Sequence, residues 1–313
     1  MTIPLLVVFT AVVAFAVPGP LRRAAWTYRA PRLAILAWYT SAAATIMSVT
    51  AAAVAALLHW SQTHDVMCAA WHVCLDALTG AHGVLCQVVA VAGVAILSSV
   101  AMRLVIAWRG VITPAGRDRR RHLALLRLAG TLHTDLGATV LPDPDPAAYL
   151  VPAGQPQVVV TTGALDRLST AELAAVLAHE RAHGRGRHHR LRDAARLLHR
   201  AFPRVPVFAH AVRQVDRLVE LCADDVAVRR HSALTLARAL VTMAAPEPTG
   251  RAMHASGGDT GERLRRLIQP PEPLPRPLQV VVAAAWLSLP ATPALLLLLG
   301  RVTPLATGGI GTF

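Results

Sequence analysis

The stretch "STAELAAVLAHERAHGRGRHHRLRD" (169–193) holds two histidines four residues apart, with a glutamate directly after the first. Its start is typical of a helix, because Ser169 can accept a hydrogen bond from the first turn while Glu172 reaches back to it. Leucine and valine residues then recur at the spacing of one helical face. The stretch therefore predicts a capped helix with one buried face.

The two histidines point to a metal site. Residues four apart project from the same face of a helix, so His179 and His183 can bind one ion. Zinc accepts imidazole nitrogens, and a catalytic zinc site keeps one position open for water. Glu180 can take a proton from that water, whose pKa the metal lowers. This motif predicts peptide hydrolysis; the competing interpretation is a polar helix face with two solvated histidines.

Zinc needs a third protein ligand, and the sequence offers two candidates. The pattern HExxHxxGxxH would use His189, with Gly186 allowing the chain to turn. The segment "ELCADDVAV" offers Glu220 instead, with Asp224 four residues later to orient a ligand imidazole. We favour Glu220, because a carboxylate in a largely apolar helix needs a partner. His189 stands among arginines and histidines, where its spacing carries little information.

The composition indicates an integral membrane protein. Of the 313 residues, 54% are hydrophobic and 16% charged, and the mean hydropathy is +0.45, which excludes an ordinary soluble domain. A helix of about 20 apolar residues crosses a bilayer, and four uncharged segments reach this length. They are Met1 to Leu21, Leu33 to about Trp60, about Val84 to Met102, and Pro277 to Gly300. The first has no basic residue before its apolar run, so we expect a retained helix rather than a signal peptide.

The arginines predict the topology. The chain has no lysine and a net charge of +13. Arginines cluster after the first segment, after the third and before the fourth, whereas the loop near 60–83 has none. Short arginine-rich loops stay in the cytoplasm, so we expect both termini outside the cell membrane and residues 110–276 inside. Because the arginines gather at helix ends without interleaved aromatics, we expect no nucleic-acid binding.

These expectations divide the chain into three parts. Residues 1–109 hold three transmembrane helices, residues 110–276 form a cytoplasmic domain, and residues 277–313 hold the fourth helix and a short outer tail. Cys68 and Cys74 share the extracytoplasmic loop, where they either form a disulfide or stay unpaired.

The internal part has its own predicted elements. Arginines and leucines at helical spacing predict an amphipathic helix over Arg117 to Leu136. The stretches "AYLV" (148–151) and "QVVVTT" (157–162) predict a strand hairpin before the histidine helix. From Arg190 to Ala244 the pattern is mostly helical, and residues 247–262 are predicted to form a loop.

Together, "VVVTTGALDRLSTAELAAVLAHERAHGRGRHH" and "ELCADDVAV" resemble the membrane metallopeptidases of the BlaR/MecR type and, more distantly, the CAAX prenyl protease and HtpX group. The resemblance implies a mainly α integral membrane protein with four transmembrane helices and a cytoplasmic α+β zincin-like (gluzincin) domain. It makes His179, His183 and Glu220 the ligands of Zn²⁺, Glu180 the catalytic base and Asp224 an acid that supports a ligand.

Two further expectations come from the same resemblance. The segment "GERLRRL" places Arg263 where the HtpX-like group carries an arginine, which would stabilise the oxyanion formed on the peptide carbonyl; a membrane-flanking arginine is the alternative. The strand Gln157 to Thr162 would pair with the substrate backbone along an open edge.

The resemblance also implies a function. The substrate would be a cytoplasmic protein, first of all a transcriptional repressor of the BlaI type that is cleaved on a signal. The alternatives are an HtpX-like protease for membrane protein quality control and a non-catalytic, zinc-binding membrane receptor. The sensor-transducers also carry a penicillin-binding domain that is acylated at an S-x-x-K motif. Since this chain has no lysine, we expect no covalent beta-lactam sensing within it. The sequence does not indicate the oligomeric state.

Overall fold

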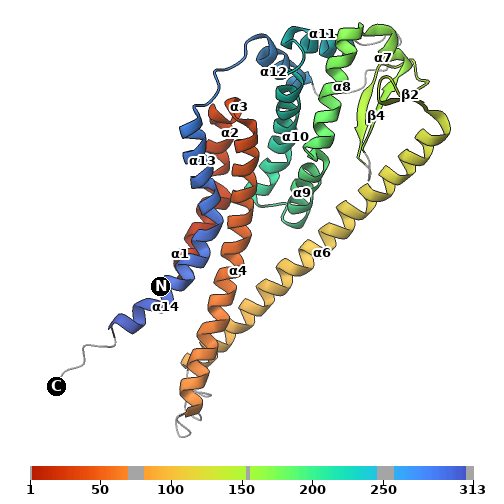
Figure 1. Cartoon of the computed structure of the whole chain (residues 1–313). Helices are drawn as coiled ribbons and strands as arrows, with labels where there is room; N and C mark the ends of the chain where they lie inside the picture. Colours follow the sequence, from red (N-terminus) through yellow and green to blue (C-terminus); the bar gives the residue numbers. More distant parts are fainter. Residues whose placement is uncertain (1, 70–80, 153–155, 245–256, 308–313) are drawn as a thin grey trace.

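The computed structural model describes residues 2–69, 81–152, 156–244 and 257–307. These residues are mostly helical and include one four-stranded sheet. The sheet lies at the end of the molecule far from both termini (Figure 1). The predicted strand hairpin is confirmed, since two strands of the sheet pair there in antiparallel fashion. The stretch between Arg190 and Ala244 is mostly helical, as predicted.

In the part of the chain that the structure describes, four helical segments are long and apolar enough to cross a membrane, judged by length and composition. They are Thr2–Arg23, Pro31–Leu58, Gln87–Ala129 and Arg276–Leu299. Many of their apolar side chains lie on the surface, such as Val91 with 68% and Leu298 with 61% of the side chain accessible. Such a surface suits the hydrocarbon of a bilayer.

The segments near the two ends of the chain are built from several helical pieces around one long helix. These pieces are α1 (Thr2–Ala11), the π-helix η1 (Val12–Ala16), α2 (Pro18–Arg23), α13 (Arg276–Ser288), the 3₁₀ turn η2 (Leu289–Ala291) and α14 (Thr292–Thr307). The long helix is α4 (Pro31–Ala69), and α1, α13 and α14 all pack against it. Figure 1 shows α1 and α13 beside α4, and the short helix α3 (Trp26–Arg29) leads into it.

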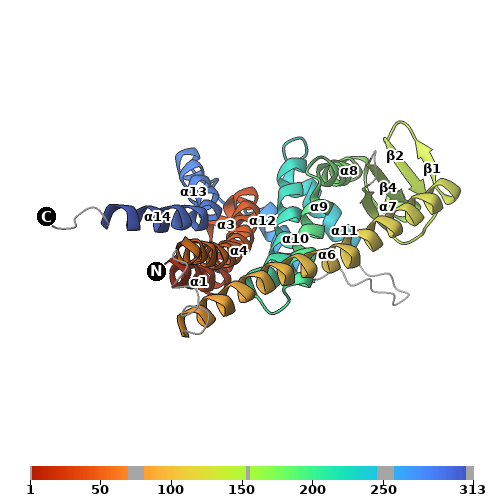
Figure 2. The same cartoon turned by 90° about the horizontal axis from the view of Figure 1, so that it is seen from below.

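The third segment differs from its prediction. Helix α6 runs without interruption from Ala81 to Ala129, so the helix predicted over Arg117 to Leu136 is confirmed only up to Ala129, as the end of α6, and Thr131–His133 form a strand instead. The apolar spacing continues across the arginines, and Pro114 removes one backbone hydrogen bond without ending the helix. Figure 2 shows α6 crossing the whole molecule, from beneath α1 to the sheet.

The sheet has the strand order β1-β2-β4-β3. Its strands are β1 (Thr131–His133), β2 (Ala138–Leu141), β3 (Ala148–Val151) and β4 (Gln157–Thr161). Strand β4 pairs in parallel with β2 and antiparallel with β3. The expected open edge on Gln157 to Thr162 is therefore wrong, because β4 has neighbours on both sides. Strands β1 and β3 are the two edges of the sheet.

Helices follow the sheet up to the last apolar segment. They are α7 (Thr162–Arg167), α8 (Thr170–Arg185), α9 (His188–Ala201), α10 (Pro206–Ala227), α11 (Ala233–Ala244) and α12 (Gly257–Ile268). The loop predicted over residues 247–262 is wrong in part, since α12 already begins at Gly257. The rest of that loop lies outside the described residues, as does the question of pairing between Cys68 and Cys74.

Two apolar clusters hold the helices that matter for the site. The first joins α4 to α10, where the fully buried Trp38 and Phe208 share a core with Val215 and Leu218. The second packs α8 against the sheet through side chains that include Val158, Val160, Leu173 and Leu177. Helix α8 is thus fixed to the sheet and α10 to a helix of the apolar bundle.

The predicted capping box of α8 is confirmed. The Ser169 hydroxyl accepts a hydrogen bond from the Glu172 N–H, and the Glu172 carboxylate accepts one from the Ser169 N–H at 2.9 Å. We expect Ser169→Ala to lower the free energy of unfolding by about 1 kcal/mol. Urea unfolding in detergent measures this, with Thr170→Ala as the control. An equal effect of both substitutions would contradict the capping role.

Candidate functional site

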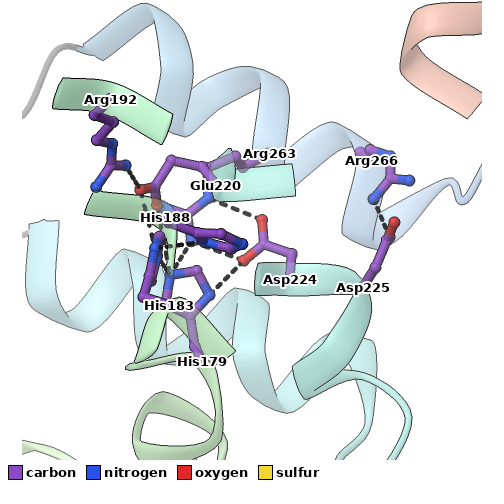
Figure 3. A network of polar contacts seen from close by, with 9 residues as sticks. All are labelled: His179, His183, His188, Arg192, Glu220, Asp224, Asp225, Arg263 and Arg266. Atoms are coloured by element: carbon purple, nitrogen blue, oxygen red, sulfur yellow. Dashed lines mark hydrogen bonds and ion pairs between the residues drawn. The ribbon is translucent and has the colours of Figure 1, made fainter. Parts of the chain in front are cut away.

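The candidate site lies where α8 packs against α10. Helix α8 presents His179 and His183, both buried, and α10 presents Glu220 and Asp224 one turn apart. The side chain of Asp224 is 2% exposed and that of Glu220 is 23% exposed. Figure 3 shows these four side chains pointing toward one another between the helices.

Three of these residues form a compact group of potential metal ligands. Nε2 of His179 lies 3.1 Å from Nε2 of His183. Each of these nitrogens lies 3.4 Å from a different carboxylate oxygen of Glu220. All ligand atoms of the group lie within 4.8 Å of one another. Two imidazoles and a carboxylate directed at one point form the donor set that zinc accepts.

A second layer of contacts fixes this group. Nδ1 of His179 lies 2.9 Å from a carboxylate oxygen of Asp224, on the side of the ring away from Glu220. Arg263 of α12 donates two hydrogen bonds of 2.8 Å to Asp224, and its third nitrogen lies 3.0 Å from Glu220. Arg192 of α9 donates to the other oxygen of Glu220. Both carboxylates are therefore held from two sides.

Helix α12 is held in turn by the short helix α3. The Tyr28 hydroxyl donates to the backbone carbonyl of Glu262 at 3.3 Å, next to Arg263 in the chain. The guanidinium groups of Arg217 and Arg266 lie 5.9 and 5.5 Å from the Tyr28 ring centre, and they bind Glu262 and Asp225. A residue next to the first apolar helix thus fixes the helix that carries Arg263.

The electrostatics of the site favour a cation between the ligands. Burial lowers the pKa of His179, but hydrogen bonds to Asp224 and Glu220 outweigh burial and raise it to about 9. Burial raises the pKa of Glu220, yet its hydrogen bonds to His179 and His183 bring that pKa far below the usual range. The surroundings therefore keep Glu220 ionised and stabilise positive charge beside it. A divalent ion fits these residues.

Glu180 lies in a different position from the three potential ligands. It lines a cavity of about 210 Å³ together with His179, Glu220 and Arg263. Burial raises the pKa of the Glu180 carboxyl, although His179 and His183 lower it in part. A carboxylate that lies beside the three potential metal ligands, but is not one of them, can exchange a proton with a bound molecule.

The structure separates the two candidates for the third ligand. Among the described residues, the potential ligand group contains Glu220 and does not contain His189. His189 lies on the first turn of α9, near the charges of Arg119 and Asp193. Of the residues predicted from sequence, the structure thus gathers His179, Glu180, His183, Glu220, Asp224 and Arg263 around one cavity or in direct contact with its walls.

Sequence reasoning missed two contacts made by α9. Nδ1 of His188 lies 2.8 Å from Nδ1 of His183, and Arg192 reaches Glu220. These two residues are four apart, so they share one face of α9, as His179 and His183 do on α8. That spacing was available in "HHRLR" and could have identified them.

The geometry predicts which substitution removes the metal. We expect Glu220→Ala to weaken zinc binding by more than the 10- to 100-fold typical of an outer partner, because it removes a ligand. His189→Ala should leave zinc binding unchanged. Zinc content and competition with a chelator measure both variants. Full zinc retention in Glu220→Ala would contradict this assignment.

Part of the chain matches the model of a known protein family. Residues 116–270 match the model of peptidase family M48. Comparisons with curated proteins and with solved structures found no match. The family match does not single out the narrower BlaR/MecR type. Its limits enclose every residue of the candidate site described above, from the sheet to α12. The segment from 116 to 270 is therefore similar to the M48 metallopeptidases, a family of zincin-like proteolytic enzymes.

Proposed function

We propose that this chain is a membrane-bound zinc endopeptidase that cleaves an extended segment of another protein. One observation carries this proposal: two imidazoles and a carboxylate from two helices converge beside a separate, partly buried carboxylate, Glu180. A purely structural zinc site would have no use for Glu180. The family match supports proteolysis in general, and the choice of zinc follows from the donor set.

Each side chain of the site has a proposed role in peptide hydrolysis. A zinc ion held by His179, His183 and Glu220 would act as a Lewis acid that polarises the peptide carbonyl and acidifies water. The Glu180 carboxylate takes the proton of the attacking water and delivers it to the leaving amide nitrogen. Its raised pKa suits both steps. We assign to Arg263, which lines the cavity, a hydrogen bond to the carbonyl oxygen as negative charge develops there.

The sheet edge gives the substrate a place to bind. Among the described residues, strand β3 pairs with β4 alone, and its first residue, Ala148, lines the same cavity as Glu180. An extended peptide added to β3 would therefore pass the reacting groups. Apolar side chains that include Val176, Leu240 and Met243 also line this cavity. We propose a substrate segment with an apolar side chain near the cleaved bond.

The cellular role remains part of the proposal. The arginine distribution supports a cytoplasmic active site, and the resemblance to the BlaR/MecR type supports a transcriptional repressor as the substrate. Because the family match supports M48 without that subgroup, an HtpX-like role in membrane protein quality control is the second candidate.

The proposal predicts a specific effect of Glu180→Gln. Loss of the general base should lower kcat about 10²- to 10⁴-fold, while the three ligands keep the bound zinc. Glu172→Gln on the same helix is the matched control, because glutamine also satisfies a capping box. The effect is measured in detergent as cleavage of casein or of the protein itself. The zinc content of each variant is determined alongside. Equal cleavage by wild type and Glu180→Gln would remove the proposed function.

A second experiment identifies the substrate. Proteins that accumulate in a Glu180→Gln strain, relative to wild type, are measured across the proteome. Accumulation of one DNA-binding protein supports the regulatory role, whereas accumulation of many membrane protein fragments supports quality control. If zinc is bound but no protein accumulates under any condition, the non-catalytic receptor is the better explanation.

A further inference from the structure

His183 is oriented by a different kind of partner from His179. Nδ1 of His179 faces the Asp224 carboxylate, whereas Nδ1 of His183 lies 2.8 Å from Nδ1 of His188. The rings of His183 and His188 meet edge to face, at an interplanar angle of 89° with centres 4.8 Å apart. Both rings are buried, with 7% and 6% of each residue exposed. His188 is not among the potential metal ligands found in the described part of the chain.

The contact fixes where the protons lie. Nε2 of His183 must be free of its proton to bind an ion, so the neutral ring carries its proton on Nδ1. That N–H can donate to Nδ1 of His188, which then accepts and carries its own proton on Nε2. A hydrogen bond of this kind sets both the tautomer and the orientation of a metal-binding imidazole.

Gly186 leaves the space that this arrangement needs. A methyl group at position 186 would lie 2.3 Å from Nε2 and 2.5 Å from Cδ2 of His188. The backbone of Gly186 itself is ordinary, with φ of −75°, while the left-handed residue of the turn is Arg187, with φ of 48°. The turn itself therefore does not require glycine at position 186; the missing side chain makes room for His188.

We infer that His188 is a positioning residue that holds His183 in its metal-binding orientation, and that Gly186 is a glycine because His188 occupies the space of its side chain. This inference rests on the metal centre of the proposed function. It gives "HGRGRH" a physical meaning that differs from a HExxHxxGxxH ligand pattern, because His188 acts through His183 and not on the ion.

The test measures metal binding in the full-length protein in detergent, without reference to cleavage. Competition with a chromophoric chelator gives the zinc affinity, and the visible spectrum of the Co²⁺ form reports the ligand geometry. We expect His188→Ala to weaken zinc binding about 10- to 100-fold and to change the Co²⁺ spectrum. His188→Asn keeps an acceptor oxygen near the position of Nδ1, so it should restore most of the affinity.

Two glycine substitutions form a matched pair, one in contact with His188 and one away from it. Gly186→Ala should reproduce the effect of His188→Ala, because the added methyl group displaces the ring. Gly184→Ala, whose methyl group would lie at 3.4 Å or more from its nearest neighbours, should bind zinc like wild type. Thermal unfolding of each metal-free variant shows whether the fold is intact, and folded variants alone are compared.

The outcomes separate this inference from the proposed function. Unchanged zinc affinity and an unchanged Co²⁺ spectrum in folded His188→Ala would overturn the inference, even if the enzyme cleaves protein. Zinc binding that depends on His188, in a chain that cleaves no protein, would support the inference and remove the proposed function alone. Equal weakening by Gly184→Ala and Gly186→Ala would overturn the assigned role of Gly186.

Discussion

The burial of Asp224 and the partial burial of Glu220 on α10 are the constraint on which the site depends. Glu220 and Asp224 lie between helices where solvent reaches them poorly, and an isolated charge in such a place costs several kcal/mol. The histidines of α8 and the guanidinium groups of Arg192 and Arg263 compensate this cost. The contacts that offset the free-energy cost of these carboxylates also direct the two imidazoles at one point.

One geometric device recurs around this constraint. Helices α8, α9 and α10 each present a pair of residues four apart: His179 with His183, His188 with Arg192, and Glu220 with Asp224. Residues at this spacing share a helix face, so three short local patterns are enough to build the centre once the helices pack. Arg263 of α12 then connects the two carboxylates.

The sequence predicted what local patterns determine. The capping box and the HExxH face depend on neighbours within one helix, and the choice of Glu220 over His189 followed from the cost of a buried charge. The sequence could not show that β2 covers one side of β4, because strand order depends on contacts between distant segments. It also placed a break in α6 where charges begin, although helical spacing continues. Arg263 was reached through resemblance, and only the packing of α12 explains its place.

The shared core of α4 and α10 has a consequence for how this chain can be divided. Residues 116–270 contain the potential metal ligands and Glu180, yet Phe208, Val215 and Leu218 are covered by Trp38 and its neighbours on α4. An excised fragment limited to those residues would present this apolar face to water and associate or precipitate. Residues 116–270 alone would therefore lack part of the core that packs α10, which the first half of α4 supplies.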